Sequence, residues 1–330
     1  MTSTAMAHAE GLPLERLDQM IWIGDVPGLG AQRCPDKAAI IFADRGVTLS
    51  YAQLDQQANA FVALMRARGV QPGERIAYLG RNSDLFLPVL FGAIRGGFVL
   101  VALNWRLTAV EIAYQLRDSQ AKFLIRDADF ATTAAQAAGT LDAPLPMLGA
   151  EGDDAGLRSL LAQAAPAVAI PHEPDQVVLQ LYTSGTTGNP KGVLITHAAL
   201  SLARHSELSS PDIAHLEAGC QMLSAMPNFH IGGMSWVLMG LVRFGTVVLT
   251  ADPMPGNMIK LIREYGCEHS FIVPTVLRAI VDELKAKNEA APPMRGIYYG
   301  AMPIGAGLLA ELMQVFNCPL LQFFGMTENT

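Results

Sequence analysis

The sequence is poor in charge and in aromatic side chains. Charged residues make up 16% of the 330 positions, aromatic residues 7% and hydrophobic residues 51%. This balance excludes an intrinsically disordered chain, which combines low hydrophobicity with high charge. The chain can bury a large core, and its length predicts about two domains.

A basic excess and paired cysteines are also missing. The 23 Lys and Arg residues are outnumbered by 30 Asp and Glu, so the net charge is −7. Nucleic acid is therefore a poor partner, and an anionic substrate must be held by a local site. The cysteines are widely spaced and form no C-x-x-C pair, which indicates free thiols in a reducing compartment, the cytoplasm. They are Cys34, Cys220, Cys267 and Cys318.

Uninterrupted apolar runs long enough to cross a membrane are lacking as well. The two candidates, residues 85–103 and 231–250, each contain an arginine near the middle, Arg95 and Arg243. An arginine costs about 2.5–3.5 kcal/mol at the centre of a bilayer. We therefore interpret both runs as helix, turn and buried strand, and expect no integral membrane segment. Residues 1–20 have neither a basic head nor an apolar core, so we also expect no signal peptide.

The sequence does contain a regular alternation of strand-like and helix-like segments. Capping boxes at residues 50–53 and 108–111 begin two helices, and Asn82 or Ser83 is the predicted cap of a third. The alternation predicts an α/β fold with mostly parallel sheets flanked by helices. The weaker pattern of residues 128–174 suggests a boundary between two sub-domains, 1–175 and 176–330. Strands are expected at residues 38–42, 47–49, 75–79, 98–102, 122–125, 177–182, 192–196, 221–226, 246–250, 269–273, 297–299 and 320–324.

One segment stands out chemically: residues 182–192 read YTSGTTGNPKG. Glycines let backbone N–H groups approach oxygen atoms closely, hydroxyl groups add donors and Lys191 adds a positive charge, so the segment suits a polyanion. A phosphate loop of the G-x-x-x-x-G-K-[ST] type is a rival interpretation, but Pro190 and Gly192 stand where that loop needs Gly and Ser or Thr. A P-loop NTPase is therefore disfavoured. A Gly- and Thr-rich surface turn is the plainer alternative.

The same segment resembles the signature of a known family. From Thr183 to Gly192 it matches [ST]-[ST]-G-[ST]-T-G-x-P-K-G of the AMP-forming adenylating enzymes, which include acyl-CoA synthetases, firefly luciferase and peptide-synthetase adenylation domains. Further segments are similar to family motifs in the same order: PNFHIGG at 227–233, YGAMP at 299–303 and FGMTE at 324–328. Residues 103–107, LNWRL, resemble bacterial fatty-acid–CoA ligases, with Trp105 expected to be structural.

The resemblance implies a role for each matched residue. The hydroxyls and lysine of the first segment would hold the β- and γ-phosphates of ATP, Thr327 would contact the nucleotide phosphate and Glu328 would bind Mg²⁺. Phe323, Phe324 and Gly300 would lie along the adenine. The implied nucleotide-binding residues are Thr183, Ser184, Gly185, Thr186, Thr187, Gly188, Lys191, Gly300, Ala301, Met302, Gln322, Phe323, Phe324, Gly325 and Thr327. The implied catalytic residues are Thr183, Lys191, His230 and Glu328.

His230, Gly232 and Gly233 would line the pocket for the acid, with the glycine pair leaving room for an acyl chain. Structural interpretations compete with these roles. Lys191 alone is typical of a solvated surface residue, His230 of a helix cap or packed side chain, and a Thr-Glu pair after glycine often begins a helix.

The resemblance implies the layered αβαβα N-terminal domain of an acyl-CoA synthetase, incomplete in this chain. Such an enzyme activates a carboxylic acid, here a fatty or other apolar one, with ATP to an acyl-adenylate and then forms a thioester with CoA. Another acceptor such as a carrier-protein thiol, or a non-catalytic nucleotide- or acid-binding protein, is the alternative. The family's C-terminal domain and catalytic lysine fall outside residues 1–330, so we expect a fragment that does not turn over by itself. A homodimer is the oligomer considered.

Overall fold

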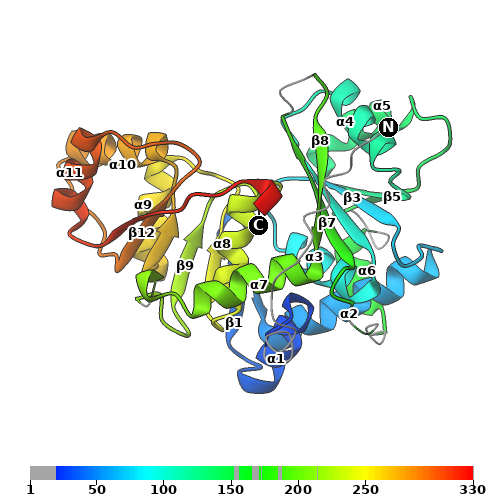
Figure 1. Ribbon diagram of the computed structural model, residues 1–330, viewed down its shortest axis with the longest axis horizontal. Helices are drawn as coiled ribbons and strands as arrows, with labels where there is room; N and C mark the ends of the chain where they lie inside the picture. Colours follow the sequence, from blue (N-terminus) through cyan, green and yellow to red (C-terminus); the bar gives the residue numbers. More distant parts are fainter. Residues whose placement is uncertain are drawn as a thin grey trace.

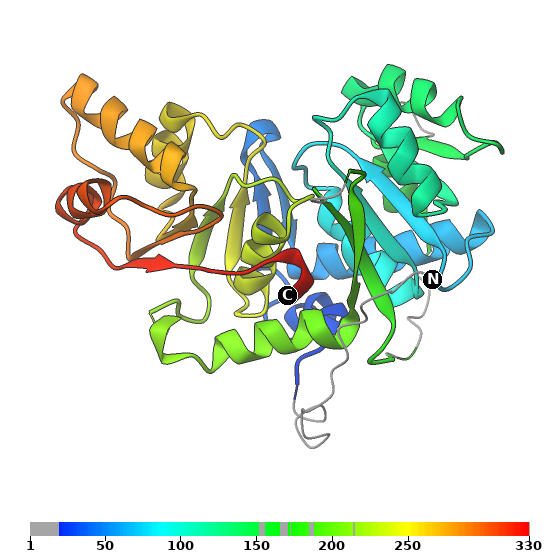
Figure 2. The same ribbon diagram turned by 45° about the horizontal axis from the view of Figure 1, so that its top comes forward.

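The computed structural model describes residues 20–151, 156–165, 171, 173–184, 188–213 and 215–329. Within these residues the strands form two sheets that lie side by side and are flanked by helices (Figure 1). Helix α7 crosses beneath both sheets, and the same arrangement is visible after rotation in Figure 2. The predicted α/β fold with mostly parallel sheets is confirmed.

The first sheet contains six strands of the described chain in the order β6-β5-β3-β4-β7-β8. Its pairs are parallel except that between β7 and β8, which form an antiparallel hairpin at one edge. The central strands are apolar throughout because helices cover both faces of a parallel sheet. The strands are β3 Arg75–Leu79, β4 Val99–Leu103, β5 Phe123–Arg126, β6 Met147–Gly149, β7 Val177–Thr183 and β8 Lys191–Thr196.

The second sheet contains seven strands of the described chain in the order β13-β12-β11-β9-β10-β1-β2. Only the edge strand β2 is antiparallel among the described strands of this sheet. The strands are β1 Ala38–Phe42, β2 Val47–Ser50, β9 Gln221–Ser224, β10 Thr246–Leu249, β11 His269–Phe271, β12 Gly296–Tyr299 and β13 Leu320–Gln322.

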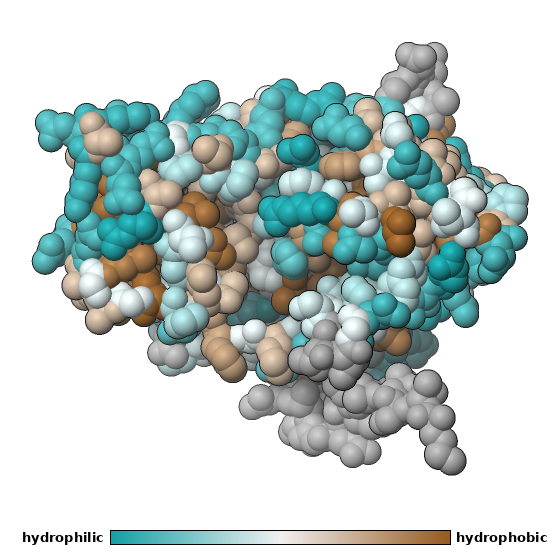
Figure 3. Space-filling model, turned by 90° about the horizontal axis from the view of Figure 1, so that it is seen from above, coloured by the Kyte–Doolittle hydropathy of each residue, from teal (hydrophilic) through white to brown (hydrophobic). Residues whose placement is uncertain are grey.

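Helices fill the connections between strands and cover the sheets. The α-helices are α1 Val26–Arg33, α2 Tyr51–Ala67, α3 Phe86–Gly96, α4 Ala109–Asp118, α5 Ala131–Ala138, α6 Leu157–Gln163, α7 His197–Leu208, α8 Ile231–Leu241, α9 Pro255–Tyr265, α10 Pro274–Lys287 and α11 Ala306–Phe316. The 3-10 helices are η2 Ile23–Asp25, η3 Ala43–Arg45, η4 Ala128–Phe130, η5 Pro211–Ile213 and η6 Thr327–Asn329. Seen from above, the surface is mostly hydrophilic, with apolar patches over the half that holds α10 and α11 (Figure 3).

Two of the three predicted helix caps are confirmed. Ser50 and Thr108 each form a complete capping box, at the start of α2 and α4. The predicted cap of α3 is wrong, because α3 begins at Phe86 and both candidate side chains are engaged elsewhere. Asn82 bonds to backbone groups of the other sheet, and the Ser83 hydroxyl lies 2.9 Å from the Tyr78 hydroxyl.

The strands do not divide between the sheets at residue 175. β1 and β2 come early in the chain but belong to the seven-stranded sheet, where β1 pairs with β10. β7 and β8 come after residue 175 but complete the six-stranded sheet. The segment proposed as a boundary, residues 128–174, supplies β6, which pairs with β5.

The two longest apolar runs form a helix followed by a strand, as predicted: α3 with β4, and α8 with β10. Their arginines are buried but paired. Arg95 donates to the Asp55 carboxylate and to the Gly24 carbonyl, each at 2.7 Å. Arg243 donates to three backbone carbonyl groups. No helix in the described part of the chain is both long and apolar enough to span a bilayer.

An ion-pair network ties the two sheets together. Arg45, in the connection between β1 and β2, pairs with Glu151, which follows β6. Arg158 of α6 then bridges Glu151 at 2.8 Å and Asp84 at 2.6 Å. Asp84 is only 1% exposed, and Arg158 is the partner that compensates this buried side chain. The four cysteines are free thiols, as predicted.

His269, at the start of β11, is fully buried, and neither of its ring nitrogens has a hydrogen-bond partner among the described residues. Burial lowers the pKa of His269 to about 4; His215 and Arg295 also lower it, while Glu268 and Glu217 raise it. The unfolded chain therefore takes up this proton at higher pH than the folded chain.

Stability should therefore fall as the pH drops from about 6.5 to about 4, by roughly 3 kcal/mol from this residue. The replacement His269→Phe keeps an aromatic ring in the site and should remove this part of the pH dependence. Urea unfolding at pH 4.5, 5.5 and 7 measures both slopes. Equal slopes for the two proteins would show that His269 does not titrate in this range.

Candidate functional site

The described residues of the segment 182–192 lie at the end of β7, at the start of β8 and directly beside these strands of the antiparallel hairpin. Thr183, the last residue of β7, is paired directly opposite Lys191, the first residue of β8. Directly opposed residues point to the same face, so the side chains of Thr183 and Lys191 leave the hairpin on the same side. Ser184 and Gly188 are exposed beside them. Three predicted residues of this segment lie outside the described part of the chain: Gly185, Thr186 and Thr187.

Glu328 reaches this hairpin from a position 145 residues away in the sequence. The Thr183 hydroxyl donates a hydrogen bond to the Glu328 carboxylate, with 3.2 Å between Oγ1 and Oε1. Glu328 lies in the short helix η6, where the Met326 N–H donates to the Asn329 side chain at 2.8 Å. Figures 1 and 2 both show η6 beside the hairpin and α8. The two strongest motifs of the sequence therefore meet in space.

The ends of β12 and β13 lie side by side next to this point. Tyr299 pairs with Gln322, and the Phe323 N–H donates to the Tyr299 carbonyl at 2.7 Å. The ring of Phe323 is stacked on Phe271, with 6.0 Å between centroids, and so it packs against the protein. Phe324 is 90% exposed. Of these two predicted adenine contacts, only the ring of Phe324 is free to face a base.

Gly300 allows a close approach within the protein itself. A Cβ at this position would lie 2.6 Å from the Phe323 carbonyl oxygen, so the missing side chain is explained by the neighbouring strand without a ligand. Ala301 follows in the left-handed conformation, with φ at 65°, and is exposed, as is Met302. The other predicted residues of this side, Gly325 and Thr327, are exposed and half-buried respectively.

The predicted acid side begins at His230, directly before α8. Its ring lies 4.3 Å from that of Phe229, which in turn makes an edge contact with Trp105. Partial desolvation, and then the Arg106 guanidinium, lower the pKa of His230 below its ordinary value, so the ring is neutral at pH 7. Trp105 packs against these rings, as expected of a structural residue, and Arg81 and Arg106 lie over its faces at 4.8 and 4.7 Å.

The glycine pair that follows has a packing role. A Cβ at Gly233 would lie 2.3 Å from the Pro227 carbonyl oxygen, and one at Gly232 would lie 3.3 Å from the ring of Phe271. The room that we predicted for an acyl chain at Gly233 is therefore filled by the loop before α8. Gly232 is half-buried and keeps some open surface.

Sequence reasoning missed Asn82 as a residue that positions the site. Its side-chain amide donates to the carbonyl groups of Met226 and Thr250 at 2.8 and 3.1 Å, and its oxygen accepts from the Asn228 N–H at 2.9 Å. These groups lie at the carboxyl ends of β9 and β10, whereas Asn82 follows β3 of the other sheet. Asn82 therefore fixes the loop that carries His230. Local patterns could not reveal this, because the three partners are distant in sequence.

A metal ion at this site would depend mainly on Glu328. The described residues contain no cluster of three or more His, Cys, Asp or Glu side chains able to hold a metal. Magnesium typically takes one or two carboxylates and completes its shell with phosphate oxygens and water. The single carboxylate of Glu328, which accepts a hydrogen bond from Thr183, fits a Mg²⁺–triphosphate rather than a metal bound by protein alone.

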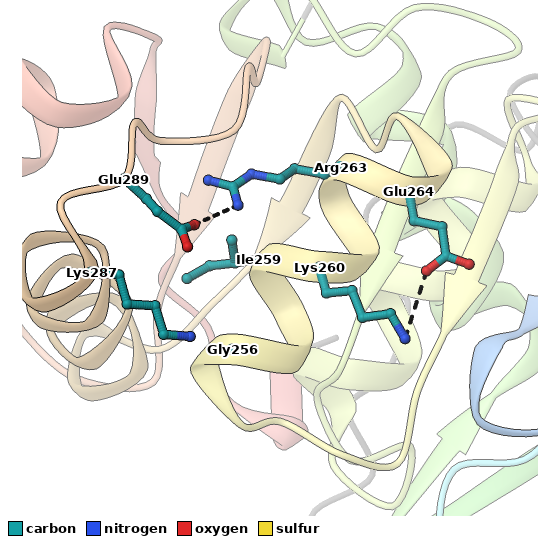
Figure 4. A pocket seen from close by; sticks show the side chains of 7 residues that line it. All are labelled: Gly256, Ile259, Lys260, Arg263, Glu264, Lys287 and Glu289. Atoms are coloured by element: carbon teal, nitrogen blue, oxygen red, sulfur yellow. Dashed lines mark hydrogen bonds and ion pairs between the residues drawn. The ribbon is translucent and has the colours of Figure 1, made fainter.

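A surface pocket of about 480 Å³ lies elsewhere, between α9 and the end of α10 (Figure 4). Its charges are already compensated, with Arg263 bound to Glu289 at 2.6 Å and Lys260 facing Glu264 at 3.9 Å. The figure shows these side chains pairing around the rim rather than converging on a centre. The lining residues are Gly256, Ile259, Lys260, Arg263, Glu264, Lys287 and Glu289. We therefore place the candidate site at the hairpin.

Residues 30–330 match the AMP-binding enzyme family. The chain belongs to this family. It is 34% identical over 302 residues to the fatty acid–[acyl-carrier-protein] ligase ScoC of Streptomyces coeruleorubidus, with 90% of this chain and 57% of ScoC covered. It is 33% identical to a feruloyl-CoA synthase of an Amycolatopsis species, with 93% of this chain and 59% of that protein covered. This AMP-binding enzyme thus spans less than two thirds of the length of either relative.

The fold leads to the same family. The N-terminal domain of FACL13 from Mycobacterium tuberculosis, in an inhibitor-bound crystal structure, superposes with a TM-score of 0.85 at 28% identity. The match covers 94% of this chain and 77% of that domain. The AMP-binding enzyme is therefore related to ligases that act on carboxylic acids, while the acid and the acceptor differ among the named relatives.

Replacing Asn82 with alanine should destabilise the protein by roughly 2–4 kcal/mol, because the carbonyl groups of Met226 and Thr250 and the Asn228 N–H lose their partner in a buried place. Chemical denaturation measures the loss. The exposed Asn189 provides the matched control, since Asn189→Ala should change stability by less than about 0.5 kcal/mol. Similar small effects for both variants would contradict the bridging role.

Gly233→Ala tests whether this glycine serves packing. The added methyl group would collide with a backbone carbonyl, which cannot rotate away, so we expect a loss of about 1–3 kcal/mol. Gly307→Ala in α11 is the control, because a Cβ there meets nothing within 4 Å and alanine favours the helix. Thermal unfolding distinguishes the two. A Gly233→Ala protein as stable as the wild type would mean that space remains open at this position.

Proposed function

We propose that this AMP-binding enzyme activates a carboxylic acid with ATP, as the nucleotide- and acid-binding part of a longer ligase. One observation supports the proposal above all: Thr183 of the hydroxyl-rich hairpin is hydrogen-bonded to Glu328 of the last motif. A lysine, hydroxyl groups and a carboxylate gathered at one point suit a magnesium-bound triphosphate, in which each phosphate charge needs compensation.

The chemistry is an in-line displacement at phosphorus. A carboxylate oxygen of the acid forms a bond to the α-phosphorus of ATP, and the bond from that phosphorus to the oxygen bridging to the β-phosphate breaks. The products are an acyl-adenylate and pyrophosphate. Lys191 and the Thr183 hydroxyl hold the β- and γ-phosphates, so that the departing charge stays compensated. Glu328 would hold the Mg²⁺, which supplies further positive charge to the phosphates when bound.

We assign His230 to the side of the site that takes the acid. A neutral ring next to Phe229 can donate a hydrogen bond to a carboxylate without replacing Lys191 as the cation of the site. The aromatic rings beside it favour an apolar acid, and ScoC, which is named for fatty acids, supports a fatty acid in particular.

Two acceptors are supported for the second step, in which a thiol sulfur bonds to the acyl carbon, the bond from that carbon to AMP breaks, and AMP and the thiol proton leave. The feruloyl-CoA synthase supports CoA, which we prefer, whereas ScoC is named for an acyl carrier protein. Magnesium, a homodimer and a cytoplasmic location remain predictions, as does the lack of turnover by the 330-residue chain alone.

The proposal predicts how the chain binds nucleotide. Lys191→Met should weaken the binding of ATP with Mg²⁺ by about tenfold or more, because a charge-assisted hydrogen bond to phosphate is lost. Glu328→Gln can still accept the hydrogen bond from Thr183 but lacks the charge for a cation, so it should abolish the effect of Mg²⁺ on ATP affinity. Isothermal titration calorimetry with and without Mg²⁺ measures both.

Lys260→Met is the matched control, because Lys260 is an exposed lysine on α9, far from the hairpin, and should leave affinity unchanged. Equal affinities for the Lys191 and Lys260 variants would refute the triphosphate site. A wild-type chain that binds neither ATP nor AMP at millimolar concentration would refute the nucleotide site altogether.

A further inference from the structure

Helix α4 contacts both stems of the β7–β8 hairpin. The first stem is β7, and the second stem is β8 with Pro190 directly before it. On the first stem, the Tyr182 hydroxyl lies 2.7 Å from the Asp118 carboxylate and 3.1 Å from the Gln115 carbonyl. Burial, and then Asp118, raise the pKa of Tyr182 above its ordinary value, so the hydroxyl keeps its proton and serves as donor. On the second stem, the Tyr114 hydroxyl donates to the Pro190 carbonyl at 3.1 Å. Tyr182 directly precedes Thr183, and Pro190 directly precedes Lys191.

On the first stem, the residue opposite Tyr182 is a glycine. Tyr182 is paired opposite Gly192, and a Cβ on Gly192 would lie 3.3 Å from the ring carbon Cζ of Tyr182 and 2.4 Å from the side-chain nitrogen of Gln180. That nitrogen in turn donates to the Tyr182 hydroxyl at 3.1 Å. The last glycine of the signature segment therefore leaves room for the Gln180 amide and for the Tyr182 ring beside it.

On the second stem, α4 contacts the backbone of Pro190. Proline has no N–H, so a neighbour can hold Pro190 through the backbone only at its carbonyl. Tyr114 uses this carbonyl. The contact therefore restrains the backbone immediately before the lysine of the site.

Helix α4 is itself well fixed. A capping box of Thr108 and Glu111 begins it, and its apolar face, Ile112, Ala113 and Leu116, is buried against the six-stranded sheet. The core of the six-stranded sheet therefore holds α4 in place, so that α4 restrains the hairpin relative to this core and not to another surface loop.

We propose that Tyr114, Asp118 and Tyr182 are positioning residues, which hold Thr183 and Lys191 at the separation that a triphosphate requires. This inference rests on the proposed function of the hairpin. None of the three side chains needs to touch ATP. Their effect should therefore be confined to the part of the ligand that the hairpin holds, the β- and γ-phosphates.

The test compares two ligands on the 330-residue chain. In Tyr114→Phe, Tyr182→Phe and Asp118→Ala, the affinity for ATP with Mg²⁺ should fall about threefold to tenfold, the value of one hydrogen bond, while the affinity for AMP stays within about twofold. Asp118→Asn keeps an oxygen that accepts from Tyr182 and should restore ATP binding. Tyr265→Phe on α9 is the matched control for the loss of a hydroxyl and should change neither affinity.

Amide hydrogen exchange gives a second measurement that does not need a ligand. Residues 188–194 should exchange faster in Tyr114→Phe than in the wild type, with the melting temperature unchanged. Equal losses of ATP and AMP affinity would indicate a general structural defect and overturn the inference. Wild-type ATP affinity in all three variants would overturn it too, while the Lys191 result would still decide the proposed function separately.

Discussion

The site depends on the way the two sheets meet, and Asn82 is the residue that fixes this meeting. Its amide satisfies three backbone groups at the carboxyl ends of β9 and β10 while its own backbone belongs to the exit of β3. Parallel strands gather functional residues at their carboxyl ends, but only within one sheet. Here the hairpin residues come from one sheet and η6 follows the other. A polar bridge between sheet ends is therefore needed before Thr183 can reach Glu328.

Ion pairs compensate the charged side chains near this junction of the two sheets. Asp84 follows Asn82 closely in the chain and is held by Arg158, which also binds Glu151, the partner of Arg45 from the other sheet. Asn82 and Glu151 thus each have a partner that belongs to the other sheet. Rigid-body sliding of the sheets would break several of these contacts at once, so the hairpin and η6 keep a fixed position relative to each other.

Local sequence signals predicted the helices and strands, whereas tertiary contacts determine how these are arranged in space. The capping boxes at Ser50 and Thr108 are complete because each uses residues three positions apart. Asn82 carries the same chemistry as a cap, yet its amide finds buried carbonyl groups far away in sequence, and these outweigh a helix end that water can solvate. For the same reason, the pairing of β1 with β10 could not be predicted, because periodicity carries no information on partners. The convergence of Thr183 and Glu328 was predictable only through the family resemblance.

The glycines of the matched motifs show how a signature can be misinterpreted. A glycine in a binding segment suggests that a ligand approaches the backbone, yet Gly233 and Gly300 each face a backbone carbonyl oxygen within 2.6 Å of where a Cβ would stand. Two separate motifs therefore need glycine for the same reason, which is to let one part of the chain pack closely on another. The residues left for the ligand are those with functional groups, Thr183, Lys191 and Glu328 among them. If so, a motif of this kind describes how a scaffold is held together as much as what it binds, and α4 becomes part of the site although no motif includes it.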